Sequence, residues 1–255
     1  MFATSPRSVL SRSLLALTLA LAGEAAADDA SKTEAPAPAK TWYSTSLNQD
    51  IFFGFTPTAQ VGIGLTDTID LTGYAVFWTI PAFGAGGSGQ NLWTEFGAGV
   101  NVKALGGKLA LNPQLGLLSG NLLSGTGGTG RKGLVGEGIV PNLTVNYNDD
   151  SLEAQFYGGY YIGTRTARDS KNNDFLHYWS FAGAKITPAF SVGAYWEHLL
   201  QTRGAGVEGA DGVYAWFGPY VQFKHGDAFL RFAGGVDVAN DTVYDFYKVS
   251  TGMTF

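Results

Sequence analysis

The chain has 255 residues, no cysteine, 36 glycines, and charged residues at only 15%. That charged share lies well below the quarter that is usual in a soluble domain, and the formal net charge of −5 argues against nucleic acid as a partner. Without cysteine, disulfides and thiolate metal sites are excluded, so the fold must depend on main-chain pairing and packing.

The first segment, residues 1–27, reads as a targeting signal. It carries Arg7 and Arg12, then an apolar run over residues 14–23, then small residues before Asp28. This pattern predicts a secretory signal peptide, because the apolar run is too short for a spanning helix. An uncleaved membrane anchor is the alternative. The Pro/Ala-rich residues 28–40 predict a disordered periplasmic leader, which leaves residues 41–255 as the folded domain.

From residue 41 onward, apolar and small or polar side chains alternate in segments of about ten residues, which is typical of a transmembrane β-barrel. Gly, Asn, Asp and Pro clusters separate the segments. In residues 51–65 one face would carry the following side chains: Phe53, Phe55, Pro57, Ala59, Val61, Ile63 and Leu65. No segment after the signal has eighteen consecutive apolar residues, so helical spans are not expected.

The connections between these segments set the expected number of strands. The pattern predicts strands at 51–65, 69–80, 91–103, 108–118, 134–147, 152–163, 175–186, 189–202, 213–224, 228–238 and 244–255. Short and long connections alternate, as in bacterial barrels, which have even strand numbers. A further strand at 41–47, turning at 48–50, would bring both termini to the periplasm. We therefore expect an all-β, antiparallel, up-and-down barrel of twelve strands, with ten as the alternative.

The chain ends in YKVSTGMTF, where alternate positions are apolar. These outward positions are Tyr247, Val249, Met253 and Phe255. The pattern resembles the C-terminal signal of bacterial outer-membrane proteins, which implies recognition by the barrel assembly machinery. A soluble periplasmic β-sandwich would also alternate, and it is the competing fold.

Longer blocks carry a second resemblance. They include QDIFFGFTPT, GYAVFWTIPAFG, NLWTEFGAG, GEGIVPNLTVNY, EAQFYGGYY and GPYVQFK. These blocks resemble a family of proteobacterial outer-membrane barrel proteins known only as a domain of unknown function. The resemblance implies a barrel in the outer membrane of a Gram-negative bacterium, reached by export. It implies no catalytic residue.

Charged side chains on the expected inward face are the candidate pore lining, because lipid would make each of them costly. They are Glu95, Lys103, Glu153, Arg165, His177, Lys185, Glu197, Lys224, Arg231, Asp237 and Lys248, and Asp70 and Arg203 share this face. Either they set the selectivity of a polar pore, or they fill a narrow barrel as cross-strand pairs. Bulky inward tyrosines favour the filled barrel: Tyr74, Tyr157, Tyr161, Tyr195, Tyr214 and Tyr220.

Glu137 breaks the alternation, since strict period two from Leu143 would point it outward. A bulge at Pro141 would turn it inward. Alternatively, Glu137 lies near the loop end of its strand and shapes the mouth.

An enzyme is not expected. The phospholipase or protease activity of some outer-membrane barrels needs a histidine with a nucleophile or carboxylate. The inward His177 has no serine motif beside it. The Gly-rich residues 119–133 lack a phosphate-loop ending and predict a flexible outer loop, where Arg131 and Lys132 could contact lipopolysaccharide phosphates.

The sequence predicts no metal and no cofactor. Membrane lipid, lipopolysaccharide and the assembly machinery are the expected partners, and the protein is expected to be a monomer. We therefore expect a passive, porin-like channel for small solutes, with a non-conducting structural or surface-interaction barrel as the alternative.

Overall fold

The structure is a computed structural model that describes residues 40–78, 93–124, 133–166, 171–239 and 245–255. The predicted signal peptide, nearly all of the predicted leader, and Arg131 and Lys132 lie outside these residues. Those assignments therefore stay predictions. Within the described residues, no helix has the length and apolar character needed to cross a membrane.

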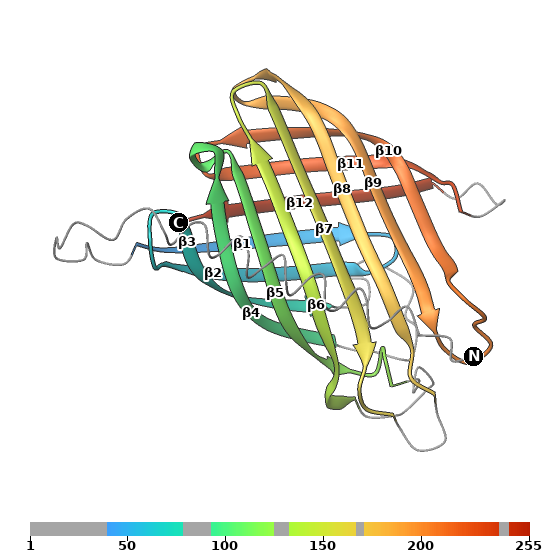
Figure 1. Ribbon diagram of the computed structural model, residues 1–255. Helices are drawn as coiled ribbons and strands as arrows, with labels where there is room; N and C mark the ends of the chain where they lie inside the picture. The colour runs from blue at the N-terminus through green and yellow to red at the C-terminus, as the bar shows by residue number, and fades with distance from the viewer. Residues whose placement is uncertain (1–39, 79–92, 125–132, 167–170, 240–244) are drawn as a thin grey trace, which may run out of the picture.

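Twelve strands in the described residues form one closed antiparallel barrel (Figure 1). The strands are β1 (Thr41–Asp50), β2 (Gly54–Gly64), β3 (Ile69–Trp78), β4 (Trp93–Ala104), β5 (Leu109–Gly120), β6 (Leu134–Asn148), β7 (Leu152–Gly163), β8 (Asp174–Thr187), β9 (Phe190–Arg203), β10 (Asp211–His225), β11 (Ala228–Asp237) and β12 (Asp245–Thr254). Each strand pairs with its neighbours in sequence, and β1 also pairs with β12. The expected twelve-stranded, up-and-down barrel is confirmed.

The seam between β1 and β12 closes the sheet. Its register runs from Ser44 opposite Thr254 to Asp50 opposite Lys248. Beyond the strand, the backbone N–H of Phe255 donates to the carbonyl of Tyr43 at 2.8 Å, and the Tyr43 N–H donates back at 3.3 Å. Closure removes the sheet edges, whose unpaired backbone groups a lipid environment would not tolerate.

Side chains alternate between the two faces of the wall, as the sequence pattern predicts. On β12, Phe246 is 3% exposed, whereas its neighbour Tyr247 is 49% exposed. Large apolar side chains recur around the outer surface: Tyr43, Ile63, Leu71, Phe96, Leu115, Leu117, Ile139, Phe156, Phe217, Phe223, Leu230, Phe232 and Met253. An apolar outer band around a closed antiparallel sheet is the arrangement of transmembrane barrels.

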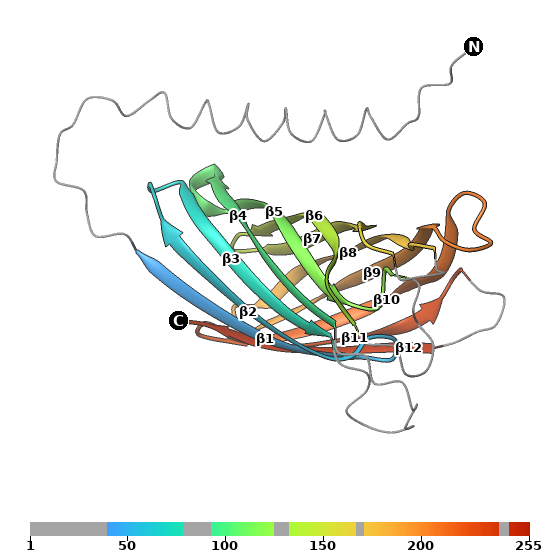
Figure 2. The ribbon, with the colours of Figure 1, turned by 90° about the horizontal axis from the view of Figure 1, so that it is seen from below.

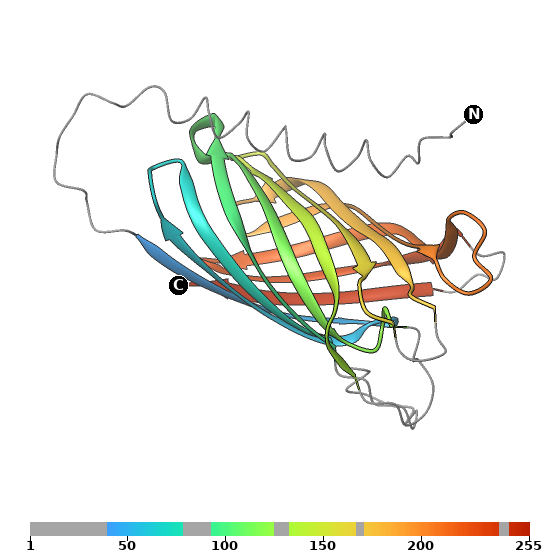
Figure 3. The ribbon, with the colours of Figure 1, turned by 60° about the horizontal axis from the view of Figure 1, so that its bottom comes forward.

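The two ends of the barrel differ (Figures 2 and 3). At one end, which we call the short-turn end, strands are joined by two to four residues, and Phe255 lies there as well. The turn after β4 is a single 3₁₀ turn, η1 (Leu105–Gly107), in which Gly106 and Gly107 have φ of 65° and 86°. Glycine adopts these angles without steric cost. At the opposite, long-loop end, the connections between strands are longer, except that three residues join β1 to β2.

The first hairpin differs from its prediction. The expected turn at residues 48–50 is part of β1, since Gln49 pairs with Phe55 and Asp50 with Gly54. The chain reverses at residues 51–53, where the Asp50 carboxylate accepts the backbone N–H groups of Phe52 at 2.9 Å and Phe53 at 2.6 Å. Phe53 was predicted to face lipid. It instead leaves the strand pattern and packs inside the barrel against Trp78 and Tyr214.

Candidate functional site

The barrel interior contains two cavities of different character. The larger, which we call the chamber, has a volume of about 300 Å³ and extends from Ser44 and Thr254 near the short-turn end to Phe53 and Trp78. The smaller, which we call the vestibule, has a volume of about 100 Å³ and lies toward the long-loop end. Its lining is dominated by aromatic and aliphatic side chains, including Phe52, Trp93, Leu122, Phe175 and Val213.

Three side chains line both cavities and separate them: Phe53, Trp78 and His177, which we call the septum. The Phe53 ring centroid lies 4.7 Å from that of Trp78 and 5.3 Å from that of His177. Rings at these distances are in van der Waals contact. The septum therefore lies at the boundary between the two cavities.

A chain of ionic contacts holds the septum to the wall. Lys248 of β12 lies 2.7 Å from Glu197 and 3.5 Å from Asp50. Glu197 is fully buried and lies 2.8 Å from His177 Nε2, and the Tyr214 hydroxyl donates to it, also at 2.8 Å. Because Asp50 also caps the turn that carries Phe53, one network positions both Phe53 and His177.

A second buried network lies nearer the short-turn end and centres on Glu153. This carboxylate accepts hydrogen bonds from Ser191 at 2.5 Å, Tyr220 at 3.1 Å and Gln222 at 2.7 Å. The Gln222 side-chain oxygen accepts two hydrogen bonds from Arg231, at 2.9 and 2.6 Å. Gln222 thus links the anion to the cation, and the Arg231 guanidinium lies over the Phe181 ring, 3.5 Å from its centroid.

The other predicted residues of the wall lie in separate places. Lys103 pairs with buried Asp70 at 2.8 Å, and Glu95 accepts a hydrogen bond from Tyr74. Lys185 donates to the backbone carbonyl of Asp149, beside a short turn. Lys224 is half-buried near the short turn after β10. Of the predicted charged set, Glu95, His177, Arg231 and Lys248 line the chamber.

Two predicted lining residues belong to the mouth instead. Arg165 is exposed beyond the end of β7 and donates to the carbonyl of Val135 at 2.5 Å. Arg165 was predicted to face inward, but β7 ends at Gly163, as expected, so the strand alternation does not extend to Arg165. Asp237 is buried at the end of β11 and accepts the backbone N–H groups of Ala215 and Ala239, each at 3.0 Å.

Glu137 is the anchor of an inward-folded segment, residues 121–124, which we call the strap. Its carboxylate accepts the backbone N–H groups of Leu122 at 2.9 Å, Leu123 at 3.1 Å and Ser124 at 3.0 Å. Leu123 and Ser124 are fully buried. The start of the loop predicted to be flexible is therefore fixed inside the mouth, and residues 125–132 lie outside the described part.

The predicted bulge at Pro141 is wrong. The register is continuous there, with Leu115 opposite Pro141, and the irregularity lies where Ser119 on β5 faces residues 135–137 on β6. Gly136, with φ of 63°, supplies the conformation that this bulge requires. The bulge reorients Glu137, so the alternative that this residue shapes the mouth agrees with its position.

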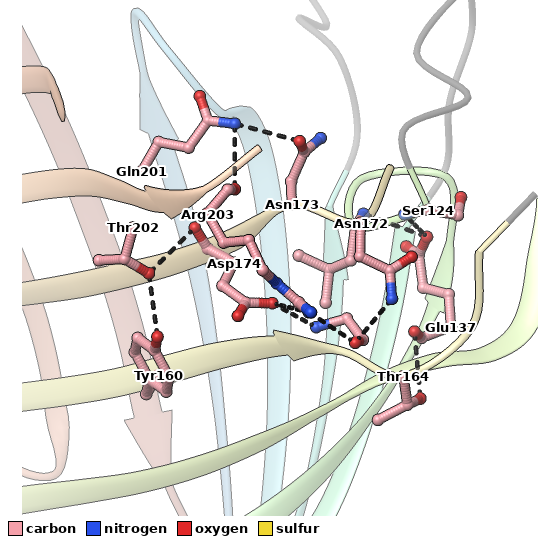
Figure 4. A network of polar contacts seen from close by, with 12 residues as sticks. Ser124, Glu137, Tyr160, Thr164, Asn172, Asn173, Asp174, Gln201, Thr202 and Arg203 are labelled. Atoms are coloured by element: carbon pink, nitrogen blue, oxygen red, sulfur yellow. Dashed lines mark hydrogen bonds and ion pairs between the residues drawn. The ribbon is translucent and has the colours of Figure 1, made fainter. Parts of the chain in front are cut away.

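Further polar contacts join the strand ends around the mouth (Figure 4). Asp174 accepts the Gly163 N–H at 2.9 Å and the Arg203 guanidinium at 2.5 Å. Asn173 donates from its backbone N–H to the Leu123 carbonyl at 2.8 Å. These contacts join the ends of β7, β8 and β9 to the strap, so hydrogen bonds fix this part of the mouth.

Sequence reasoning missed the strap and the septum. Glu137 was the only available signal, because a carboxylate at a position where alternation fails needs a buried partner. Nothing in the local pattern distinguishes Phe53 from the lipid-facing phenylalanine two positions later. Among the described residues, no three His, Asp or Glu side chains are grouped so as to hold a metal ion.

Comparison with known protein families identifies the family of the chain. The profile of a family of unknown function, DUF6733, matches residues 10–255. The chain belongs to this family. No curated protein matches the chain.

Solved structures show the same fold. An outer-membrane channel from Pseudomonas putida F1 has a TM-score of 0.51 at 12% identity, over 89% of this chain and 99% of that one. The KdgM porin has a TM-score of 0.46 at 12% identity, over 83% and 99%. The NanC porin has 0.47 at 9% identity, over 83% and 98%. At 12% identity, the likeness to the Pseudomonas putida channel supports the barrel fold and nothing finer.

Proposed function

We propose that this protein is a passive channel for small solutes in the bacterial outer membrane. The observation that carries the proposal is the chamber, a polar cavity of about 300 Å³ that extends from the short-turn end to the septum. Barrels of eight strands are filled by side chains or hold one small ligand, whereas porins of sixteen to eighteen strands hold open channels. Twelve strands leave room for a partly filled interior, which fits a narrow pore.

The septum makes Phe53 the expected restriction. Its ring is carried by a three-residue turn and lies against Trp78 and His177, which belong to the wall. Passage past a constriction of apolar rings depends steeply on its radius and hydration. The size of the conducted solutes is therefore set at Phe53 and not by the charged pairs of the wall.

A non-conducting structural barrel is the competing function, and the septum is the observation that favours it. The aromatic cluster on β8–β12 fills part of the interior, with Tyr214 stacked on Trp216 at 4.1 Å and Trp216 on Phe246 at 5.1 Å. If the septum never opens, the chamber is a closed-ended pocket.

Single-channel recording of the refolded mature protein in planar bilayers decides between the two. We expect discrete steps from the native protein, and conductance raised roughly two-fold or more by Phe53→Ala, because the ring is removed from the proposed restriction. Phe232→Ala is the matched control, since it removes the same ring from the lipid-facing side. No steps from either the native protein or Phe53→Ala, with folding shown by heat-modifiable migration, would reject the channel.

A further inference from the structure

The wall of the chamber is chemically uneven. Toward β1, β2, β5, β6 and β7 its lining consists mostly of neutral hydroxyl and amide side chains, such as Asn48, Thr58, Gln60, Gln114, Asn142 and Gln155. Toward β8, β9 and β11 it carries the aromatic side chains Trp179, Tyr195 and Phe229. Pockets for small molecules combine such flat apolar surfaces with a few polar groups that fix orientation.

Charges that reach the chamber already have partners within the wall. Lys248 contacts Glu197 and Asp50. Arg231 is bonded to Gln222 and covered by Phe181, and Glu95 accepts the Tyr74 hydroxyl. At the septum, an ionic ligand would have to break a contact among Lys248, Glu197 and Asp50 to gain a counter-charge, which is costly. Among the described residues, Arg231 has only the neutral Gln222 amide as its hydrogen-bond partner, and it belongs to the network nearer the short-turn end. The septum end of the chamber is therefore suited to a neutral ligand.

Three buried polar atoms at the septum end of the chamber find no hydrogen-bond partner among the described residues: Thr56 Oγ1, Trp78 Nε1 and His177 Nδ1. Thr56 is 7% exposed and His177 is 4% exposed. Buried polar groups are nearly always bonded, so each such atom calls for an explanation. All three residues line the chamber, and Trp78 and His177 both contact Phe53.

The three atoms offer complementary hydrogen-bond roles. The indole N–H of Trp78 only donates, and the Thr56 hydroxyl both donates and accepts. His177 Nε2 faces the Glu197 carboxylate at 2.8 Å, so Nε2 carries a hydrogen, and Nδ1 accepts when the ring is neutral or donates when the ring is protonated. Ligand hydroxyl groups, which donate and accept in turn, satisfy this set.

We propose that the septum end of the chamber is a binding subsite for a neutral polyhydroxylated solute of the sugar class. Its hydroxyl groups would bond Thr56, Trp78 and His177, and its C–H face would lie on the aromatic wall that includes Trp179. The cavity volume of about 300 Å³ is at the lower bound for small-molecule pockets and fits one sugar ring. This inference deepens the proposed channel function by naming its solute class.

The test measures binding apart from conduction. Saturation-transfer difference NMR on the refolded, detergent-solubilised protein would use D-glucose as the probe and D-glucuronate as its charged counterpart. We expect transfer from the protein to glucose, weaker transfer to glucuronate, and affinity for glucose reduced about two- to ten-fold by Thr56→Val and by Trp78→Phe, each of which removes one hydrogen-bonding group. Thr94→Val on β4, whose side chain does not line the chamber, should leave affinity unchanged.

Three outcomes would overturn the subsite: no transfer to glucose, equal transfer to both probes, or unchanged affinity in Thr56→Val and Trp78→Phe. Heat-modifiable migration of every variant shows whether it has folded. Binding to a protein that gives no conductance steps would reject the channel and keep the subsite. Conductance steps without binding of glucose would reject the subsite and keep the channel, so the two proposals fail separately.

Discussion

Lys248 shows how one residue can hold a closed sheet in register. It lies opposite Asp50 across the seam between β12 and β1 and also contacts Glu197 of β9. Removing one partner of a buried ion pair costs about 3–5 kcal/mol, because the remaining charge stays buried and unpaired. A seam shifted by one residue would turn Lys248 to lipid and take its ammonium group away from both carboxylates. The contact therefore selects one register among the alternatives.

Asp149, in the turn after β6, is outside the membrane-spanning strands and depends on local hydrogen bonds. The Tyr147 hydroxyl donates to it at 2.7 Å, and the N–H groups of Ser151 and Leu152 donate at 2.8 Å. These bonds, that from Tyr147 first, lower the pKa of Asp149 from its ordinary 3.8 to about 2. A lowered pKa in the folded state adds stability above pH 3.8, and this stability is lost as pH falls toward 2.

We expect Asp149→Asn to make the stability of the folded barrel depend less on pH in the acid range. Asparagine still accepts the backbone N–H groups with its side-chain oxygen but does not titrate, so its unfolding midpoint should fall less between pH 4 and pH 2. Thermal unfolding in detergent, followed by circular dichroism, measures this difference. Asp150→Asn, in the same turn, is the matched control. A midpoint that falls as steeply in Asp149→Asn as in the native chain would contradict the assignment.

The strands were predictable from sequence, whereas the points where their regularity fails were not. Period-two alternation continues through a tight hairpin, so nothing in DIFFGFT showed that the chain reverses at residues 51–53. The bulge beside Gly136 depends on pairing with β5, and the strap depends on a carboxylate from β6 that reaches back to an earlier loop. Long-range contacts determine both features, and they define the mouth and septum.

β12 carries the prediction about assembly. Tyr247, Met253 and Phe255 point outward with exposed fractions of 49, 42 and 65%, and the Phe255 backbone completes the seam with Tyr43. We propose that this face is the segment that the assembly machinery reads, as the resemblance of its sequence implies.

Deleting Phe255 should lower the folded fraction in the outer membrane, because it removes the terminal ring and two backbone hydrogen bonds at the seam. Phe255→Trp keeps both a ring and the backbone, so it should assemble normally. Heat-modifiable migration of outer-membrane fractions measures the folded fraction. A deletion variant with the same folded fraction in the outer membrane as the native protein would contradict the proposed role of Phe255.

At the scale of the whole molecule, the even number of strands, the closure of the sheet and the alternation of short and long connections depend on one another. An even strand number places both ends of the described barrel on the same side, and closure places Phe255 beside Tyr43 there. Side chains from both ends of the sequence and from strands between them reach the chamber, so no contiguous part of the sequence contains it. The charged inward positions were recognisable in advance, but which of them face a cavity depends on aromatic packing across the barrel, which no strand pattern reveals.

The orientation in the membrane is the last prediction. Barrels of bacterial outer membranes have short periplasmic turns and longer outer loops, so the long-loop end, with the vestibule and strap, should face outward. The chain has no cysteine, which makes single cysteines unambiguous reporters. Glu208→Cys, exposed between β9 and β10, should react with a membrane-impermeant maleimide on intact cells. Asp227→Cys, exposed in the turn after β10, should react only after permeabilisation. The reverse labelling would place the short-turn end outside and the long-loop end in the periplasm. Solutes from outside would then meet the chamber before the septum.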